Sequence, residues 1–271
     1  TLGLVLEPLD GLTLTYDAWN IESDGTVGLF GEENHMLLDF VLRLQTNDLN
    51  NCGNIQTNPA VFRDDPDEDV AAAMIQLGLC PFGEATRVAD VYDNLGLRTV
   101  AGWDAGMFYD VDLPFGSLTL KHQVAFWDEK TQQNPPQAAP ILQAYEDELI
   151  DPLDYPLVGF GDLVKIEGTP KMRTKSTLRL RTGAYTVGLT QTGRSEVLEP
   201  DVRLRPVVAF SRLNAYVDYR FDLNDANARL RFGVNNVHDR RAPLADYRFG
   251  FLGDLDNNTR RSFYFDFRVS Y

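Results

Sequence analysis

The C-terminal stretch, residues 261–271, alternates strictly between apolar and polar side chains. Phe263, Phe265, Phe267, Val269 and Tyr271 fall on one side, and each is preceded by a residue of the other side, which are Ser262, Tyr264, Asp266, Arg268 and Ser270 in order. A period of two predicts an extended strand with one apolar and one polar face. The pattern suits both a strand of a soluble β-domain and a strand that faces lipid, so the rest of the chain has to decide between them.

The same alternation recurs in eight earlier segments, so the chain is predicted to be all-β with about nine strands. Several of these segments reach about ten residues, the length that a tilted strand needs to cross a bilayer. The predicted strands lie at about 1–7, 12–22, 98–111, 118–126, 172–181, 185–189, 207–221, 229–235 and 262–271.

The links between these strands differ systematically in length. Short turns are predicted near residues 8–11, 112–117, 181–184 and 221–227, whereas long loops span about 23–95, 128–169, 194–204 and 238–260. Antiparallel strands place alternate links at opposite ends of a sheet, so every short turn lies at one end. Transmembrane antiparallel β-barrels have short periplasmic turns and long extracellular loops, so this fold is predicted over a soluble sandwich.

The first long loop interrupts the strand pattern and is predicted to contain short helices near His35–Leu44 and Asp67–Leu79. We expect a structured insertion; an independent small domain is the alternative. An odd number of strands is unusual for a single-chain bacterial barrel, and an open edge in lipid leaves backbone groups unpaired. Unless the strand count is wrong by one, we expect polypeptide upstream of Thr1 to seal the wall. The absence of a signal peptide also suggests processing or a longer protein.

Composition excludes several classes of protein. No run approaches the roughly 18 apolar residues of a membrane helix, and the net charge of −15 argues against nucleic-acid binding. Cys52 and Cys80 lie in the same long loop. In an oxidising compartment they are predicted to form a disulfide that stabilises the loop by about 3 to 4 kcal/mol; two unrelated buried thiols are the alternative.

One motif carries a family resemblance. The stretch Leu230-Arg-Phe-Gly-Val-Asn-Asn-Val-His-Asp-Arg-Arg-Ala-Pro243, followed by the aromatic last strand, resembles the C-terminal signature of TonB-dependent outer-membrane receptors. Its matching positions are Gly233, Asn235, Asn236 and Asp239. His238 departs from the family pattern, where Phe is usual, and Thr259-Arg260-Arg261 stands where a Gly-Arg pair is common.

The resemblance implies a plugged barrel of about 22 strands, of which residues 1–271 would be the C-terminal part without the plug domain. It implies uptake of a scarce nutrient, which is a siderophore, a cobalamin, a saccharide or a peptide. The implied partners are outer-membrane lipid, an N-terminal barrel and plug portion on the same or a separate chain, and TonB through that portion. The implied location is the bacterial outer membrane.

Basic residues dominate the predicted lumen face, which suits either an anionic ligand or salt bridges to a plug; the ordinary polar lining of a large barrel is the simpler interpretation. Asp254, Asp256 and the asparagines after them suit either calcium or a solvated turn, and the turn is favoured. A passive porin or adhesin-type barrel is the alternative function. We expect no enzyme, no catalytic or metal site and no cofactor. The lumen-facing candidates are Arg179, Arg181, Arg212, Asp218, Arg220, Arg229 and Arg231.

Overall fold

The computed structural model describes residues 1–166, 168–199, 205–224, 226–245 and 250–270. The chain divides into two compact units, which are described separately. The sheet unit comprises Thr1–Ile21, Val100–Lys130 and the described residues from Leu163 onward. The loop unit comprises Glu22–Thr99 and Thr131–Asp162.

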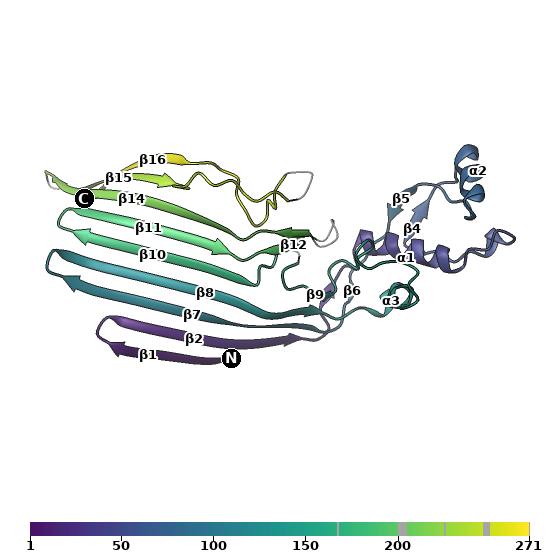
Figure 1. The fold of residues 1–271 in the computed structure, drawn as a ribbon, viewed down its shortest axis with the longest axis horizontal. Coiled ribbons are helices and arrows are strands. Elements are labelled where there is room, and N and C mark those ends of the chain that lie inside the picture. Colours follow the sequence, from purple (N-terminus) through teal and green to yellow (C-terminus); the bar gives the residue numbers. More distant parts are fainter. Residues whose placement is uncertain (167, 200–204, 225, 246–249, 271) are drawn as a thin grey trace. The chain divides into compact units, whose positions relative to one another are not determined.

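Nine long strands form one antiparallel sheet in which each strand pairs with its neighbours in sequence (Figure 1). The two-residue strand β9 (Gly161–Asp162) pairs with the end of β8. The predicted fold class, an all-β chain with a large antiparallel sheet and short helices in its long loops, is confirmed. The nine strands are β1 (Leu2–Leu9), β2 (Leu12–Ser23), β7 (Arg98–Leu113), β8 (Gly116–Gln132), β10 (Met172–Thr182), β11 (Tyr185–Arg194), β14 (Phe210–Leu223), β15 (Ala226–Asn235) and β16 (Ser262–Ser270).

The four predicted short turns are present, and they join β1 to β2, β7 to β8, β10 to β11 and β14 to β15. Figure 1 shows these hairpin ends on the same side of the sheet. Their sequences fit the turn geometry, because Gly11 and Gly183 have φ of +77° and +52°, a region that glycine enters without steric cost.

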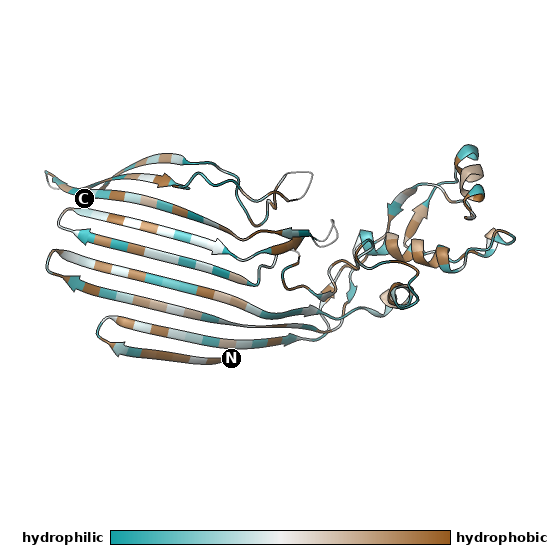
Figure 2. Cartoon of the chain, viewed as in Figure 1, coloured by the Kyte–Doolittle hydropathy of each residue, from teal (hydrophilic) through white to brown (hydrophobic). Residues whose placement is uncertain are grey.

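One face of the sheet is mainly apolar on all nine strands, with His122 on β8 hydrogen-bonded to Ser176 on β10 within it. Cross-strand partners such as Leu4 with Tyr16, Leu178 with Leu189, and Phe232 with Phe265 share this face. The alternation of hydrophobic and hydrophilic residues is visible in Figure 2 along most of the long strands, whereas β1 is mostly hydrophobic. Phe263 and Phe265 are 64% and 67% exposed, so they are not packed in a core. Soluble proteins rarely expose so large a continuous apolar surface.

Several boundaries differ from the sequence prediction, including the end of β11 at Arg194 instead of residue 189 and the start of β15 at Ala226 instead of residue 229. Strand β8 continues to Gln132, into the segment predicted as loop, because Thr131 and Gln132 pair with β9 rather than following an apolar alternation. Strand β14 begins at Phe210 instead of Val207, because Val207 belongs to a separate hairpin of β12 (Val197–Glu199) and β13 (Arg205–Val207). Val197 and Val207 are both buried in a small cluster with Ala245.

The loop unit has its own hydrophobic core, which includes Phe30, Leu38, Val41, Ile141 and Phe160. Helix α1 starts earlier than predicted, and α2 matches its prediction closely. None of the helices among the described residues is long and apolar enough to cross a membrane. The elements are α1 (Glu32–Gln45), α2 (Glu68–Gln76), α3 (Ala139–Glu146), the 3₁₀ turns Cys52–Asn54 and Pro136–Ala138, and the short pairs β3 (Val27–Gly28) with β6 (Asp93–Asn94) and β4 (Val61–Arg63) with β5 (Ala85–Val88).

A buried carboxylate joins three parts of this unit. Asp39 on α1 is fully buried, and its Oδ2 accepts a hydrogen bond of 2.9 Å from the Nε of each of Arg43 and Arg63. Its Oδ1 accepts the backbone N–H of Asn58 at 2.9 Å. A buried charge is tolerated only with such partners, so Asp39 fixes β4 and the segment before it to α1.

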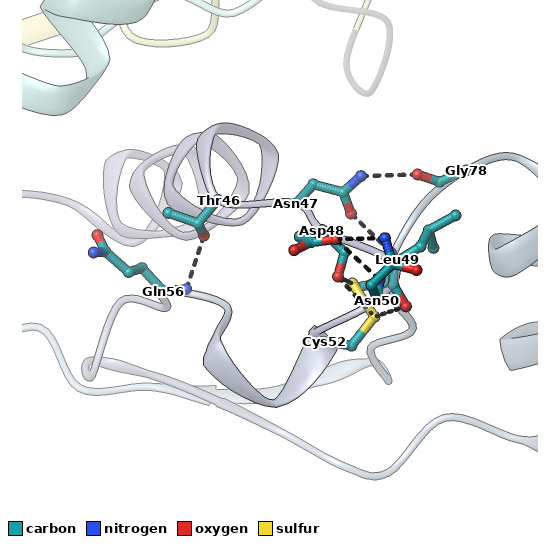
Figure 3. The surroundings of a disulfide bond; sticks show 9 residues. Thr46, Asn47, Asp48, Leu49, Asn50, Cys52, Gln56 and Gly78 are labelled. Carbon is teal, nitrogen blue, oxygen red and sulfur yellow. Dashed lines mark hydrogen bonds between the residues drawn. A yellow bond between two sulfur atoms is a disulfide. The ribbon is translucent and has the colours of Figure 1, made fainter.

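Cys52 and Cys80 form a disulfide with a Cα–Cα distance of 5.5 Å. Figure 3 shows Asn47 beside this bond, directed toward Gly78. The amide of Asn47 donates to the carbonyl of Gly78, and its carbonyl accepts the backbone N–H of Cys80, both at 2.8 Å. The disulfide and Asn47 therefore hold both ends of the segment that contains α2.

Candidate functional site on the polar face of the sheet

The register of the sheet aligns charged residues in rows across the strands. One row, the paired row, runs from Arg181 through Thr186 and Asp218 to Arg231 and Asp266. A second row lies next to it on the side of the short turns. In this second row Arg229 stands directly opposite both Arg220 and Arg268.

The Asp218–Arg231 pair is a two-point ion pair within the paired row. Arg231 Nε donates to Asp218 Oδ1 at 2.6 Å, and Nη2 donates to Oδ2 at 2.8 Å. The side chain of Asp218 is 3% exposed, and the Arg231 guanidinium stacks on the Tyr216 ring at 3.9 Å from its centroid. Both carboxylate oxygens are thus occupied, so this pair has a structural role in the wall rather than a free charge for a ligand.

The second row, together with Arg181 at the end of the paired row, is less well compensated. Arg229 Nη2 donates to Asp266 at 2.7 Å, but no side-chain ion pair forms at Arg181, Arg220 or Arg268 within the described part of the chain. These four arginines line one open hollow of about 640 Å³ together with Asp222, Asn227 and Ser270. Three of the four are among the lumen-facing candidates; Arg268 was assigned to the polar side of the last strand but was not named as a candidate.

A second hollow of about 360 Å³ lies on the same face and includes Arg173, Arg194, Arg212 and Asp256. Arg212 Nη2 donates to the Thr259 carbonyl at 2.7 Å, while its buried Nε has no acceptor among the described residues. Arg194 Nε donates to Asp256 at 2.9 Å, and both side chains are buried. No local pattern indicates this pair, which joins residues 62 positions apart.

The pairing with Arg194 occupies the carboxylate of Asp256, which was weighed as a calcium ligand. Within the ranges that the structure describes, no group of three or more His, Cys, Asp or Glu side chains is arranged to hold a metal ion. Arg179 lies on the same polar face but outside both hollows, with Nη2 at 3.5 Å from Thr119 Oγ1. Tyr271, the last predicted position of the aromatic strand, lies outside the described residues.

The two asparagines that follow Val234 organise the end of β15. Asn236 is buried with φ of +54°. Its amide donates to the carbonyls of Arg240 and Thr259 at 2.7 and 3.2 Å, and its carbonyl accepts the Arg240 N–H at 2.9 Å. Asn235 pairs with Ser262 on β16. These contacts place the start of the 238–260 loop against its end, so the asparagines act on backbone geometry.

Asp239 also joins the start of the 238–260 loop to its end. Its Oδ1 accepts hydrogen bonds from Arg260 Nε at 2.8 Å and from the backbone N–H of Arg261 at 2.9 Å. The Arg260 guanidinium, helped by that backbone N–H, holds the pKa of Asp239 well below its usual range. Arg260 and Arg261 are therefore the partners of Asp239.

Gly233 has a packing role. A Cβ atom at Gly233 would lie 2.2 Å from Cζ of Tyr264, and a Cβ at Gly188 would lie 2.2 Å from Cζ of Tyr216. Each tyrosine ring therefore lies flat across a glycine on the neighbouring strand, and a side chain at either glycine would displace the ring.

Comparison with known proteins supports the fold. Neither a protein-family model nor a curated protein matches the sequence. A mutant of the ferric enterobactin receptor PfeA from Pseudomonas aeruginosa is structurally similar, with a TM-score of 0.51 and 13% identity over 98% of this chain. The chain spans 29% of the length of that receptor. BauA, the ferric preacinetobactin receptor from Acinetobacter baumannii, matches 98% of the chain, which covers 35% of BauA, with 11% identity and a TM-score of 0.32.

Proposed function

We propose that this chain forms the C-terminal part of the wall of a TonB-dependent outer-membrane receptor, which imports a scarce nutrient into a bacterial cell. The observation that carries the proposal is the apolar face of the sheet, which exposes large hydrophobic side chains on β1, β2, β10, β11, β14, β15 and β16 and continues across the partly buried apolar residues of β7 and β8. In a barrel wall this face contacts lipid, and the polar face with its ion pairs lines the lumen.

The two edges of the sheet support a wall that is completed by other polypeptide. Among the described residues, β1 pairs only with β2, and β16 only with β15. Hydrocarbon does not tolerate a row of unpaired backbone N–H and C=O groups, so a sheet of this kind persists in a membrane only if its edges are paired. Upstream strands and a plug, on the same or a separate chain, are the proposed partners, and TonB acts through that portion.

The proposed nutrient is an iron–siderophore complex, chosen from the siderophore, cobalamin, saccharide and peptide classes. The structurally similar PfeA is a ferric enterobactin receptor, and the polar face carries Arg173 and Arg212 at one hollow, where Arg194 is already paired with Asp256. Many ferric siderophores are anionic, and guanidinium groups on a low-dielectric wall attract anions.

The experiment is uptake of radiolabelled ferric siderophores by iron-limited cells that produce the intact protein, with and without functional TonB. We expect accumulation only when both the protein and TonB are present, and no open-channel conductance when the purified protein is placed in planar bilayers. TonB-independent entry together with steady conductance would instead identify a passive porin and contradict the proposal.

A further inference from the structure

A polar patch interrupts the apolar face of the sheet. It consists of His122 on β8, Ser176 on β10 and Gln191 on β11, three strands that lie side by side (Figure 1). Register aligns the three residues in one row, because Ser176 is the direct partner of both His122 and Gln191. The next positions on the same face toward the short turns are Leu120, Leu178 and Leu189.

Two aromatic pairs show where the polar patch lies along the strands. Tyr185 contacts Tyr219 at the short-turn end, and Phe126 stacks on Trp103 toward the long loops, each with ring centroids 5.0 Å apart. In a barrel wall, aromatic girdles flank an apolar band about 25 Å tall. Gln191 follows Tyr185 by six positions on β11, which is about 15 Å across the membrane for a strand tilted by about 40°. In the proposed wall, the polar patch therefore lies inside the hydrocarbon.

The sheet itself uses only part of the hydrogen-bonding capacity of the polar patch. His122 Nδ1 and Ser176 Oγ form a hydrogen bond of 2.8 Å. Gln191 is exposed, and its side chain makes no hydrogen bond to any residue that the structure describes. A carboxamide can donate two hydrogen bonds and accept two, and leaving it unpaired in hydrocarbon is costly. Gln191 therefore needs a partner from outside this sheet.

We propose that the polar patch is the centre of a homodimer interface, in which a second copy of the protein packs its own polar patch against the first. The inference rests on the proposed function, because Gln191 lacks a partner only if this face contacts lipid rather than water. Since a carboxamide both donates and accepts, two Gln191 side chains related by a two-fold axis can form reciprocal hydrogen bonds. Lipid headgroups lie outside the apolar band and do not reach this depth.

Small side chains beside the polar patch favour close approach of a second wall. Gly193 follows Gln191 on the same face of β11, and its partners on the neighbouring strands are Thr174 and Ser211. Between transmembrane helices, small residues of this kind permit close packing and hydrogen bonds, which replace the missing hydrophobic driving force. Arg240 Nη1 donates to Ser211 Oγ at 2.8 Å, so charged groups begin at the outer edge of this small-residue surface rather than at its centre.

Cysteine crosslinking of the intact protein in outer membranes tests the proposed interface. The variant Leu189→Cys places a thiol beside the polar patch and keeps Gln191, and a membrane-permeant bis-maleimide is the crosslinker. Cys52 and Cys80 are already joined in a disulfide, and the unmodified protein gives the background. We expect a covalent homodimer, identified by mass spectrometry, at least fivefold more abundant than with Phe265→Cys, an exposed position of the same face on β16.

Two results of the crosslinking would overturn the inference. One is equal amounts of homodimer from Leu189→Cys and Phe265→Cys. The other is a crosslink from Leu189→Cys to a different protein, which would identify a heterologous partner at the polar patch.

Removal of the carboxamide gives a second, quantitative readout. Leucine suits a lipid-facing position, so Gln191→Leu is expected to fold. Because two reciprocal hydrogen bonds are lost, its dimer dissociation constant should rise about tenfold, measured by Förster transfer between labelled copies on dilution in bilayers. The matched control Thr182→Val removes a polar group from the same face at the short-turn end of β10 and should leave the constant unchanged. Equal constants for the two variants would contradict the inference.

The failure of this inference is distinguishable from failure of the proposed function. If the protein stays monomeric in bilayers while uptake still requires TonB, only the dimer interface is wrong. If the homodimer forms and depends on Gln191 but uptake does not require TonB, the interface is correct and the import function is wrong.

Discussion

Gly233 shows how one residue in the motif supports the wall. Replacing it with Ala places a Cβ 2.2 Å from Cζ of Tyr264 on β16. The tyrosine ring then has to move away from its position over residue 233 on β15. We expect Gly233→Ala to lower the free energy of unfolding by about 1 to 2 kcal/mol, measured by urea titration of the intact protein in bilayers.

The control for this substitution removes the ring. In a Tyr264→Ala background, Gly233→Ala should stabilise the protein by about 0.5 to 1 kcal/mol, because glycine inside a strand is entropically costly. Gly253 has open space where an alanine Cβ would lie, so Gly253→Ala should change the stability little. Destabilisation by Gly233→Ala that persists without Tyr264 would show that the ring is not the cause.

The pairing of Asp239 with Arg260 predicts that the stability of the folded protein depends on pH. Because Arg260 and the Arg261 N–H lower its pKa from 3.8, the ionised form is favoured in the folded state. Its stabilising contribution is therefore present above the ordinary aspartate pKa and is lost as the pH falls through the lowered value. A ¹³C NMR titration of the aspartate carboxyls, with Asp239→Asn to assign the signal, should give a midpoint below 3.8. A midpoint at or above that value contradicts the Arg260 pairing.

Sequence patterns predicted the face of each residue better than its partner. Alternation is local, and the register puts the predicted lumen-facing residues on one face of the sheet; that this face lines a lumen stays a prediction. These residues are Arg179, Arg181, Arg212, Asp218, Arg220, Arg229 and Arg231. The contact partner of a side chain depends on strand register, which cannot be read from a single sequence. The difference between Arg231, which is bound to Asp218, and Arg220, which faces Arg229, appears only in the structure.

At the scale of elements, the disulfide stabilises the segment that contains α2. Helix α2 has no buried residue, so its own packing contributes little and the covalent link matters more. The Cys52–Cys80 bond closes a loop over 28 positions, which corresponds to about 3 to 4 kcal/mol in the chain-entropy model. We expect Cys52→Ser/Cys80→Ser to expose residues 53–79 to rapid hydrogen exchange and proteolysis.

The sheet serves as the internal control in this experiment. Exchange in β10, β11, β14 and β15 should be unchanged, because these strands are held by their own ladders. Adding a reductant should reproduce the effect in the unmodified protein and have no effect on the double variant. Unchanged protection of residues 53–79 after reduction would mean that the buried Asp39 network suffices to hold this segment.

The elements that were predicted least well are those with weak periodicity. Nine strands and two helices could be found because each repeats an apolar position at a regular interval. The β12–β13 hairpin could not, since it has only three residues on each side and its buried valines pack against Ala245, a contact distant in sequence. The separate core of the loop unit likewise depends on contacts between Phe30, Ile141 and Phe160, which no local pattern predicts.

At the scale of the whole molecule, the central question is the environment of the apolar face. Leu189 and Thr190 are adjacent on β11 at the same depth, but they point to opposite faces: Leu189 pairs with Leu178 and Ala215, and Thr190 pairs with Thr177 and Asn214. Arginine at either position adds the same charge and similar volume. The difference between the two variants therefore reports the environment of each face.

If the apolar face contacts lipid, Leu189→Arg should lower the stability of the protein in phospholipid bilayers by about 2 to 4 kcal/mol. Thr190→Arg, on the polar face, should change it by about 0.5 kcal/mol or less. The readouts are the urea midpoint in bilayers and the folded band on unheated electrophoresis gels. In water an exposed leucine tolerates arginine, so equal, small effects of the two substitutions would place the apolar face in solvent and remove the basis of the proposed receptor.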